Sequence, residues 1–269
     1  MFSKEELDRY SRHIILPGVG ARGQRKLVDA RVLVVGAGGL GSPVLTYLAA
    51  AGMGCLGIVD DDKVDLTNLQ RQVLYHTDDV GKLKTTAATE RIRALNPNVQ
   101  VSAYPERLSR QNIRSIIRAF DLIIDGSDNF PTRYLVNDAC ILEGKPLLYG
   151  AISQFEGQVS LWNTSTHEGA RGPCYRCLFP SPPPPGSVPS CAEAGVFGVL
   201  PGVVGSMMAV EALKVLLGLG TPLAGVLLHY DALESDIRRI RVQRNVDCVI
   251  CGDEPQQHDL IDYRAFCGL

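Results

Sequence analysis

The sequence lacks a long run of basic residues, and its formal net charge at pH 7 is only −2. A direct nucleic-acid partner is therefore a poor hypothesis, because such binding depends on a basic patch or stripe. The first residues, Met1 to Glu6, also lack the apolar core of a signal peptide. We therefore expect a cytoplasmic protein. No repeat of solenoid length is present, which excludes that architecture.

Long charge-free segments are scarce. Residues 194–210 form a charge-free segment of 17 residues, which is slightly short for a membrane span. It is interrupted by glycine and proline, and the charged residues Glu211 and Lys214 follow at once. We expect a buried loop and helix here, and no membrane segment.

The chain has eight cysteines but no export signal, so a disulfide framework is not expected. Cys174 and Cys177 form one C-x-x-C pair, and Cys248 and Cys251 form another. Four thiolates in two such pairs fit a tetrahedral structural Zn²⁺ site, while a redox pair is the competing interpretation. The pairs are 70 residues apart in sequence. A zinc site therefore requires the fold to bring the C-terminal segment back to the main body.

Alternating apolar strands and helices predict a Rossmann-like, doubly wound α/β sheet that is mainly parallel. A capping box, Ser3 with Glu6, predicts a leading helix that carries Arg9 and Arg12. Beyond residue 151 the regular crossover helices stop, which indicates antiparallel additions at residues 157–163 and 226–242. The other expected strands are 31–35, 56–60, 99–104, 121–125 and 146–151, and the other expected helices are 42–52, 80–96 and 109–119.

A glycine loop follows the first expected strand. Gly36, Gly38 and Gly41 match G-x-G-x-x-G, a pattern in which backbone N–H groups at a helix N-terminus face a polyphosphate. Asp60 ends the next strand, where its carboxylate is able to accept hydrogen bonds from ribose hydroxyls. Taken alone, this pattern favours a nicotinamide or flavin dehydrogenase. Glycines that serve only packing are the structural alternative.

Residues 60–72 make a dehydrogenase the less favoured hypothesis. They read Asp-Asp-Asp-Lys-Val-Asp-Leu-Thr-Asn-Leu-Gln-Arg-Gln. This segment resembles the D-x-D-x-V-x-x-[ST]-N-L-x-R-Q signature of the ubiquitin-activating superfamily, and it is most similar to that of the bacterial MoeB/ThiF adenylyltransferases. The other stretches that carry the resemblance occur in order at residues 9–12, 80–84, 125–129, 173–177 and 190–195.

The resemblance implies that ATP binds at the glycine loop and that Asp128 holds Mg²⁺. It also implies that Arg71 and Lys84 place positive charge where the pyrophosphate departs, with Asn68 as a neutral donor. Asp125 either caps its turn or takes part in catalysis. The implied nucleotide-binding residues are Gly36, Gly38, Gly39, Gly41, Asp60, Asp62, Asn68, Arg71, Gln72, Lys84, Asp128 and Asn129.

Arg12 lies far from the glycine loop in sequence. The resemblance implies that it reaches into the nucleotide site of the other subunit, which makes the enzyme a homodimer with two composite sites. Arg9 either assists Arg12 or only solvates the helix. We accordingly treat residues 1–269 as a single adenylyltransferase domain, which comprises an N-terminal helix (3–16), a nucleotide-binding core (28–165), a cysteine- and proline-rich loop (166–195) and a C-terminal part with the second zinc pair (196–269).

Cys191 follows the proline-rich stretch 181–186. In ThiF-like and eukaryotic relatives a cysteine in this region forms a covalent link with the carrier protein, whereas many MoeB-type enzymes do not need it. A covalent role and an inert loop cysteine both stay open. The expected catalytic residues are Arg12, Arg71, Lys84, Asp128 and Cys191.

The implied reaction is ATP-dependent adenylation of the C-terminal glycine carboxylate of a ubiquitin-like sulfur carrier that ends in Gly-Gly. No general base is required, because a terminal carboxyl with a pKa of about 3.5 is already ionised at pH 7. Sulfur is expected from a separate protein, a cysteine desulfurase or a rhodanese. Molybdopterin synthesis, thiamin synthesis and tRNA thiolation stay open as pathways. The rival hypotheses are a nicotinamide-dependent oxidoreductase and a non-catalytic module that only holds the carrier.

Overall fold

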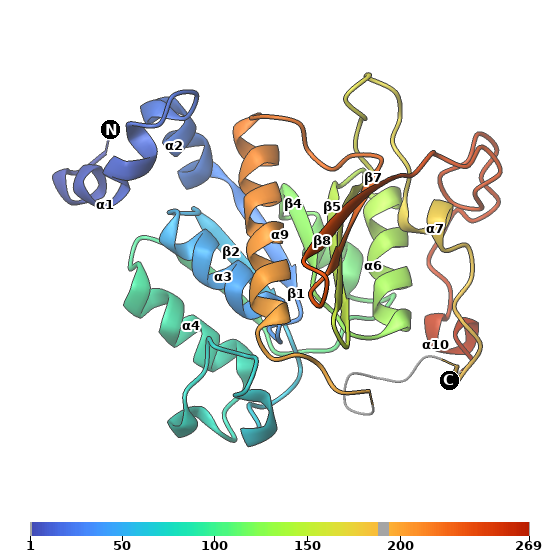
Figure 1. Cartoon of the computed structure of the whole chain (residues 1–269), viewed down its shortest axis with the longest axis horizontal. Coiled ribbons are helices and arrows are strands. Elements are labelled where there is room, and N and C mark those ends of the chain that lie inside the picture. The colour runs from blue at the N-terminus through green and yellow to red at the C-terminus, as the bar shows by residue number, and fades with distance from the viewer. Residues whose placement is uncertain (1, 188–193, 269) are drawn as a thin grey trace.

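The computed structural model describes residues 2–187 and 194–268, and its centre is one mixed eight-stranded sheet (Figure 1). The strand order is β3-β2-β1-β4-β5-β6-β7-β8. Strands β3 to β5 in this order run parallel, and β6, β7 and β8 extend the sheet antiparallel. The strands are β1 (Arg31–Val35), β2 (Cys55–Val59), β3 (Gln100–Tyr104), β4 (Leu122–Asp125), β5 (Leu147–Ser153), β6 (Glu156–Trp162), β7 (Val226–Asp231) and β8 (Asp236–Arg241). The predicted mixed α/β sheet is confirmed.

Helices cover both faces of the parallel part. Helices α3 (Gly41–Ala50), α4 (Lys84–Leu95) and α9 (Leu200–Leu217) pack in one core cluster, and α5 (Ile113–Ile117), α6 (Phe130–Leu142) and α10 (Tyr263–Phe266) pack in the other. Within β1, Val32 and Val34 join the first cluster, while Leu33 and Val35 join the second. This is why the strand is apolar from Val32 to Val35 instead of alternating.

The N-terminal hairpin consists of α1 (Lys4–Ile14) and α2 (Gly20–Asp29), and α2 contacts α9. The predicted capping box is present, since Ser3 N–H donates to the Glu6 carboxylate and Glu6 N–H donates to Ser3 Oγ. The short elements are η1 (Leu66–Asn68), η2 (Thr77–Asp79) and α7 (Tyr175–Leu178).

Helix α9 contains most of the charge-free segment. By length and composition it is the helix of the described chain that passes the test for a membrane span. In this structure it is a core helix, packed against α3, β5 and β6. Glycines permit this close packing, because a Cβ at Gly157 would lie 2.3 Å from the Val204 side chain and one at Gly205 would lie 2.4 Å from Pro43.

Three expected boundaries were wrong. The helix expected from residue 80 begins at Lys84, because Gly81 has a φ of +90° and Leu83 pairs with Lys63 as an isolated bridge. The helix expected at 109–119 is only the five-residue α5, and it is preceded by a turn in which Ser109 N–H donates to Asn112 Oδ1. Residues 226–242 form a hairpin of two strands instead of one.

Candidate functional site

Two loops meet at the carboxyl edge of the sheet, where β1 lies between β2 and β4. The glycine loop 36–41 follows β1, and residues 126–129 follow β4. A Cβ built on Gly36 would lie 3.1 Å from the carbonyl oxygen of Gly126, so the two loops are in direct contact. The strand order changes direction here, which is where open α/β sheets bind their ligands.

The glycines of the loop have different reasons to be glycine. Gly36 has a φ of +86°, and a Cβ on Gly41 would lie only 2.0 Å from the Gly36 carbonyl oxygen. A Cβ on Gly39 would press on Pro201 at 3.1 Å. A Cβ on Gly38 would meet only Gln72 Nε2, at an ordinary 3.6 Å. Packing therefore explains three of the four glycines, and Gly38 is the one left open to an approaching phosphate.

Asp60 joins the glycine loop to the acidic segment after β2. Its Oδ2 accepts from Ala37 N–H at 2.8 Å, and its Oδ1 accepts from Asp62 N–H at 2.9 Å. Burial raises the pKa of Asp60, and the nearby Lys84 ammonium opposes that rise. Both carboxylate oxygens of Asp60 thus already accept a hydrogen bond from a backbone N–H. A ribose hydroxyl would donate to their remaining lone pairs.

The two expected cations lie beside this loop. Lys84 is the first residue of α4 and is buried, and its Nζ contacts Asp62 Oδ2 at 2.7 Å. The Cγ of Arg71 is 3.7 Å from the Cβ position of Gly39, and its Nη1 donates to the carbonyl of Thr67. Arg71 thereby reaches the glycine loop, and Lys84 reaches the acidic segment whose Asp60 holds that loop.

Asn68 and Gln72 belong to the segment that holds Arg71. Asn68 Oδ1 accepts from Asp65 N–H at 3.3 Å and so closes the η1 turn. Gln72 is 4 % exposed, and its Oε1 is buried without a hydrogen-bond partner among the described residues. An unpaired buried oxygen is a costly feature, and it identifies Gln72 as a group that a ligand or a water molecule could satisfy.

Asp128 lies at the mouth of the second loop. It is exposed, and its carboxylate makes no hydrogen bond or ion pair within residues 2–187 and 194–268. Asn129 instead caps α6, where its Oδ1 accepts from Thr132 N–H at 3.0 Å. Asp125 is buried and accepts from Ser127 N–H at 2.9 Å, so it caps the turn. Burial raises the pKa of Asp125, against the opposing charge of Arg133.

Sequence reasoning missed Arg133. Its Nη2 donates to the carbonyl of Ser127, and its Nε is buried without a partner in the described part of the chain. It therefore holds the loop that ends in Asp128. The spacing from Asn129 to Arg133, one turn of the helix that Asn129 caps, was the available signal.

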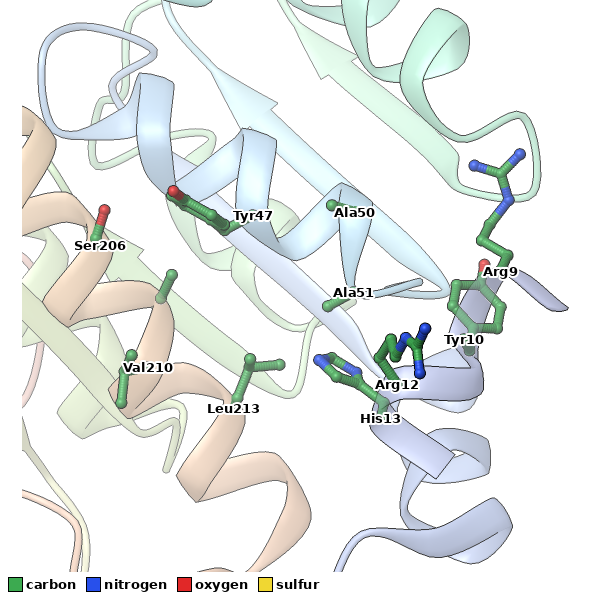
Figure 2. A pocket seen from close by; sticks show the side chains of 11 residues that line it. Arg9, Tyr10, Arg12, His13, Tyr47, Ala50, Ala51, Ser206, Val210 and Leu213 are labelled. Carbon is green, nitrogen blue, oxygen red and sulfur yellow. The ribbon is translucent and has the colours of Figure 1, made fainter. Parts of the chain in front are cut away.

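Arg12 lies away from the glycine loop of its own chain. With Tyr10 and His13 of α1, it lines a cavity of about 430 Å³ together with side chains of α3 and α9 (Figure 2). The lining residues Ala50 and Ala51 mark the far end of α3, whose ten residues span about 15 Å from the loop. Arg9 donates to the Leu95 carbonyl at 2.9 Å and pairs with Glu5 at 3.6 Å. These contacts give Arg9 a structural role that does not require a part in catalysis.

The four paired cysteines converge as predicted. Their sulfur atoms all lie within 4.8 Å of one another, with Cys174 to Cys248 at 3.7 Å and Cys177 to Cys251 at 3.4 Å. Zn–S bonds of about 2.3 Å in a tetrahedron place sulfurs about 3.8 Å apart, so the cluster fits the ion. Cys191 lies outside the described residues, and Cys55 and Cys140 are buried in the core.

These features define a Rossmann-like α/β protein with a glycine loop between β1 and α3, charged side chains near that loop, and a four-cysteine cluster. The sequence matches the ThiF family over residues 10–250, and the chain belongs to that family. It is 64 % identical over 268 residues to the sulfur carrier protein adenylyltransferase of Thermus thermophilus, covering 100 % of this chain and 99 % of that protein.

Two further relatives are less similar. The SAMP-activating enzyme E1 of Haloferax volcanii is 49 % identical over 265 residues, covering 98 % of this chain and 96 % of its own. The probable adenylyltransferase/sulfurtransferase MoeZ of Mycobacterium tuberculosis is 50 % identical over 267 residues, but this chain spans only 66 % of it. Among solved structures, Escherichia coli MccB with MccA-N7isoASN has a TM-score of 0.80 at 24 % identity, covering 91 % of this chain and 75 % of that one, a likeness of fold alone.

Proposed function

We propose that this protein uses ATP to adenylate the C-terminal glycine carboxylate of a ubiquitin-like sulfur-carrier protein. The observation that supports the proposal is that three segments meet at the glycine loop: Arg71 lies near Gly39, Lys84 acts on Asp60, and the loop with Asp128 contacts Gly36. The Thermus relative, which matches this chain along nearly its whole length, is named for the same activity. A dehydrogenase would give these three side chains no joint purpose.

The rate of this reaction depends on where the protein places positive charge, and it requires no proton transfer to start. The carrier's terminal carboxylate is ionised at pH 7, so it attacks the α-phosphorus directly and releases pyrophosphate as the acyl-adenylate forms. Negative charge grows on the departing pyrophosphate, and fixed cations stabilise it without reorganisation. Lys84, which is buried, and Arg71, which lies over Gly39, are the side chains that supply this charge.

Asp128 is the residue that fits a magnesium ion. Mg²⁺ prefers a few carboxylates combined with substrate phosphates, and Asp128 is an exposed carboxylate, unpaired among the described residues, in the loop that contacts Gly36. When bound, the ion neutralises charge on the triphosphate. The four-cysteine cluster fits Zn²⁺, which would tie Cys248 and Cys251 to the segment that holds Cys174 and Cys177.

We infer that the working unit is a homodimer. Arg12 is exposed and has no hydrogen bond or ion pair among the described residues, yet it lies a helix length from its own loop. The large apolar side chains Tyr47 and Val210 beside the same cavity are 55 % and 57 % exposed, as expected for a face covered by a second copy. The second copy would then supply Arg12 to the first.

The sulfur is proposed to come from a separate cysteine desulfurase or rhodanese. MoeZ and the MOCS3 proteins are named for both adenylyl and sulfur transfer, whereas the Thermus protein is named for adenylation alone. Molybdopterin synthesis, thiamin synthesis and tRNA thiolation stay open as pathways. We place the chemistry in the cytoplasm, without a direct nucleic-acid or membrane partner.

The decisive experiment is ATP–pyrophosphate exchange against a panel of carriers that end in Gly-Gly. We expect exchange with at least one carrier, and no exchange when the terminal glycine is removed. Tight NADH binding without exchange would support an oxidoreductase instead. Carrier binding without exchange would indicate a non-catalytic module.

A further inference from the structure

The two peptide groups on either side of Ala37 are held from different segments of the chain. Ala37 N–H donates to Asp60 Oδ2 at 2.8 Å, and its carbonyl oxygen accepts from the hydroxyl of Tyr75 at 2.6 Å. The next carbonyl, that of Gly38, accepts from the N–H and the hydroxyl of Ser42. Two consecutive carbonyls of the glycine loop are therefore occupied by donors of this chain.

An anion site needs this arrangement. A carbonyl oxygen carries partial negative charge, so a loop that binds phosphate has to turn its carbonyls away from the ligand. It binds the ligand with N–H groups other than that of Ala37, which Asp60 already holds. Tyr75 is a fixed anchor for the Ala37 carbonyl, because it is 5 % exposed and its ring belongs to the larger core cluster. Burial, with help from nearby carboxylates, raises the pKa of Tyr75, so its hydroxyl keeps the proton that it donates.

Tyr75 also joins the loop to the segment that holds the catalytic cation. Its own N–H donates to the carbonyl of Gln72 at 3.2 Å, one residue after Arg71. Gln72 in turn faces Gly38, and Arg71 lies over Gly39. A single hydroxyl thus ties the conformation of the loop to the placement of the side chains around it.

We propose that Tyr75 is a positioning residue for the nucleotide, which keeps the Ala37 carbonyl turned away from the triphosphate. The inference rests on the proposed function, because it takes the phosphates of ATP as the ligand of the glycine loop. Tyr75 itself touches the backbone and not the reacting atoms.

The test is Tyr75→Phe, which removes the hydroxyl and keeps the ring. With the donor gone, the Ala37 carbonyl is free to turn, and we expect the KM for ATP in pyrophosphate exchange to rise about tenfold, as for the loss of one buried hydrogen bond. The KM for the carrier should stay unchanged. Amide hydrogen exchange at residues 37–41 should become faster. Incorporation of 4-aminophenylalanine at position 75, which restores a donor on the same ring, should return the KM for ATP toward that of the unmodified protein.

Tyr134→Phe is the matched control. Tyr134 is another buried tyrosine whose hydroxyl donates to a backbone carbonyl, that of Phe179 at 3.0 Å, in a different part of the fold. It should lower the melting temperature without a selective change in the KM for ATP. The proposal is overturned if Tyr75→Phe leaves the KM for ATP unchanged, if the KM values for ATP and carrier rise together, or if 4-aminophenylalanine fails to rescue. If the unmodified protein binds no ATP, the proposed function fails first and the inference fails with it.

Discussion

At the scale of single residues, the two loops of the site are held in the same way. After β1, the N–H of Ala37 is bound by Asp60 and its carbonyl by Tyr75. After β4, the N–H of Ser127 is bound by Asp125 and its carbonyl by Arg133. In each loop a carboxylate and a donor fix the backbone in advance of ligand binding. Such preorganisation is what electrostatic catalysis requires.

Asp128 provides a prediction at this scale. Asp128→Ala should reduce pyrophosphate exchange by about 100-fold or more, because it removes the carboxylate that is proposed to hold Mg²⁺ against the triphosphate in the transition state. Asp29→Ala is the control. Asp29 is also an exposed aspartate, and it lies at the opposite end of β1 from the glycine loop. Equal activity of the two variants in the exchange assay would contradict the role of Asp128.

Glu143 provides a second residue-scale prediction, on pH. Arg118 at 2.6 Å and Arg114 at 2.5 Å lower the pKa of Glu143 from 4.5 to about 2. A carboxyl with a depressed folded-state pKa stabilises the fold above its unfolded pKa, and that contribution is lost as the pH falls from 4.5 toward 2. Glu143→Gln should therefore lower the melting temperature at pH 7 and make little difference at pH 2. A melting difference that is the same at both pH values would refute this account.

At the scale of elements, α6 links the site to the C-terminal segment. The helix begins directly after Asp128 and Asn129, and its residue Asp138 is fully buried. The Asp138 carboxylate pairs with Arg176, which lies between the two cysteines of the first C-x-x-C pair. It also accepts from Gln257 and from the hydroxyl of Tyr263, each at 2.8 Å. Two features thus hold the C-terminal segment to the main body: the cysteine cluster and the Asp138 carboxylate.

The Asp138 carboxylate contacts Gln257 and Tyr263 directly, whereas the cysteine cluster holds the chain earlier, at Cys248 and Cys251. We therefore expect Asp138→Asn to release residues 257–268 and zinc chelation to leave them largely in place. Removing one partner of a buried ion pair costs about 3 kcal/mol or more, because Arg176 is left charged and buried. Hydrogen exchange of residues 257–268 is the readout, with urea unfolding for stability. Asp259→Asn is the control, since that carboxylate is 81 % exposed and only 3.4 Å from Arg114. Loss of protection on chelation alone would show that zinc is the main clamp.

At the scale of the whole molecule, the proposed homodimer would complete the site of each chain with Arg12 of the other copy. The α1–α2 hairpin places Arg12 near Ala51 at the far end of α3, and the exposed side chains of Tyr47 and Val210 line the same cavity (Figure 2). A two-fold dimer over this face would bring each Arg12 to the partner's loop and each loop to the partner's Arg12.

Subunit mixing tests this arrangement. Arg12→Ala and Asp128→Ala should each be nearly inactive in exchange. A heterodimer of the two has one intact composite site and one site that lacks both side chains. Random mixing makes half of the dimers heterodimers, so we expect recovery to about a quarter of the unmodified activity. No recovery in a sample that contains dimers by light scattering would rule out shared sites.

The sequence alone determined the elements whose signal is local. Strand β1 was readable from four consecutive apolar residues, the start of α1 from Ser3 and Glu6, and the glycine loop from its spacing. The family resemblance identified Arg71, Lys84 and Asp128 as neighbours at the loop, although they lie in three separate segments of the chain. Their roles in binding and catalysis stay predictions.

Only the tertiary structure decided which backbone groups the side chains hold. Nothing local in Tyr75 indicates that its hydroxyl reaches Ala37, 38 residues earlier, or in Asp138 that it gathers donors from residues as far away as Tyr263. The same holds for the true start of α4, where Gly81 and the Lys63–Leu83 bridge override an apparently helical pattern. Local patterns report propensity and burial, whereas a buried polar group takes whichever partner the packed chain brings to it.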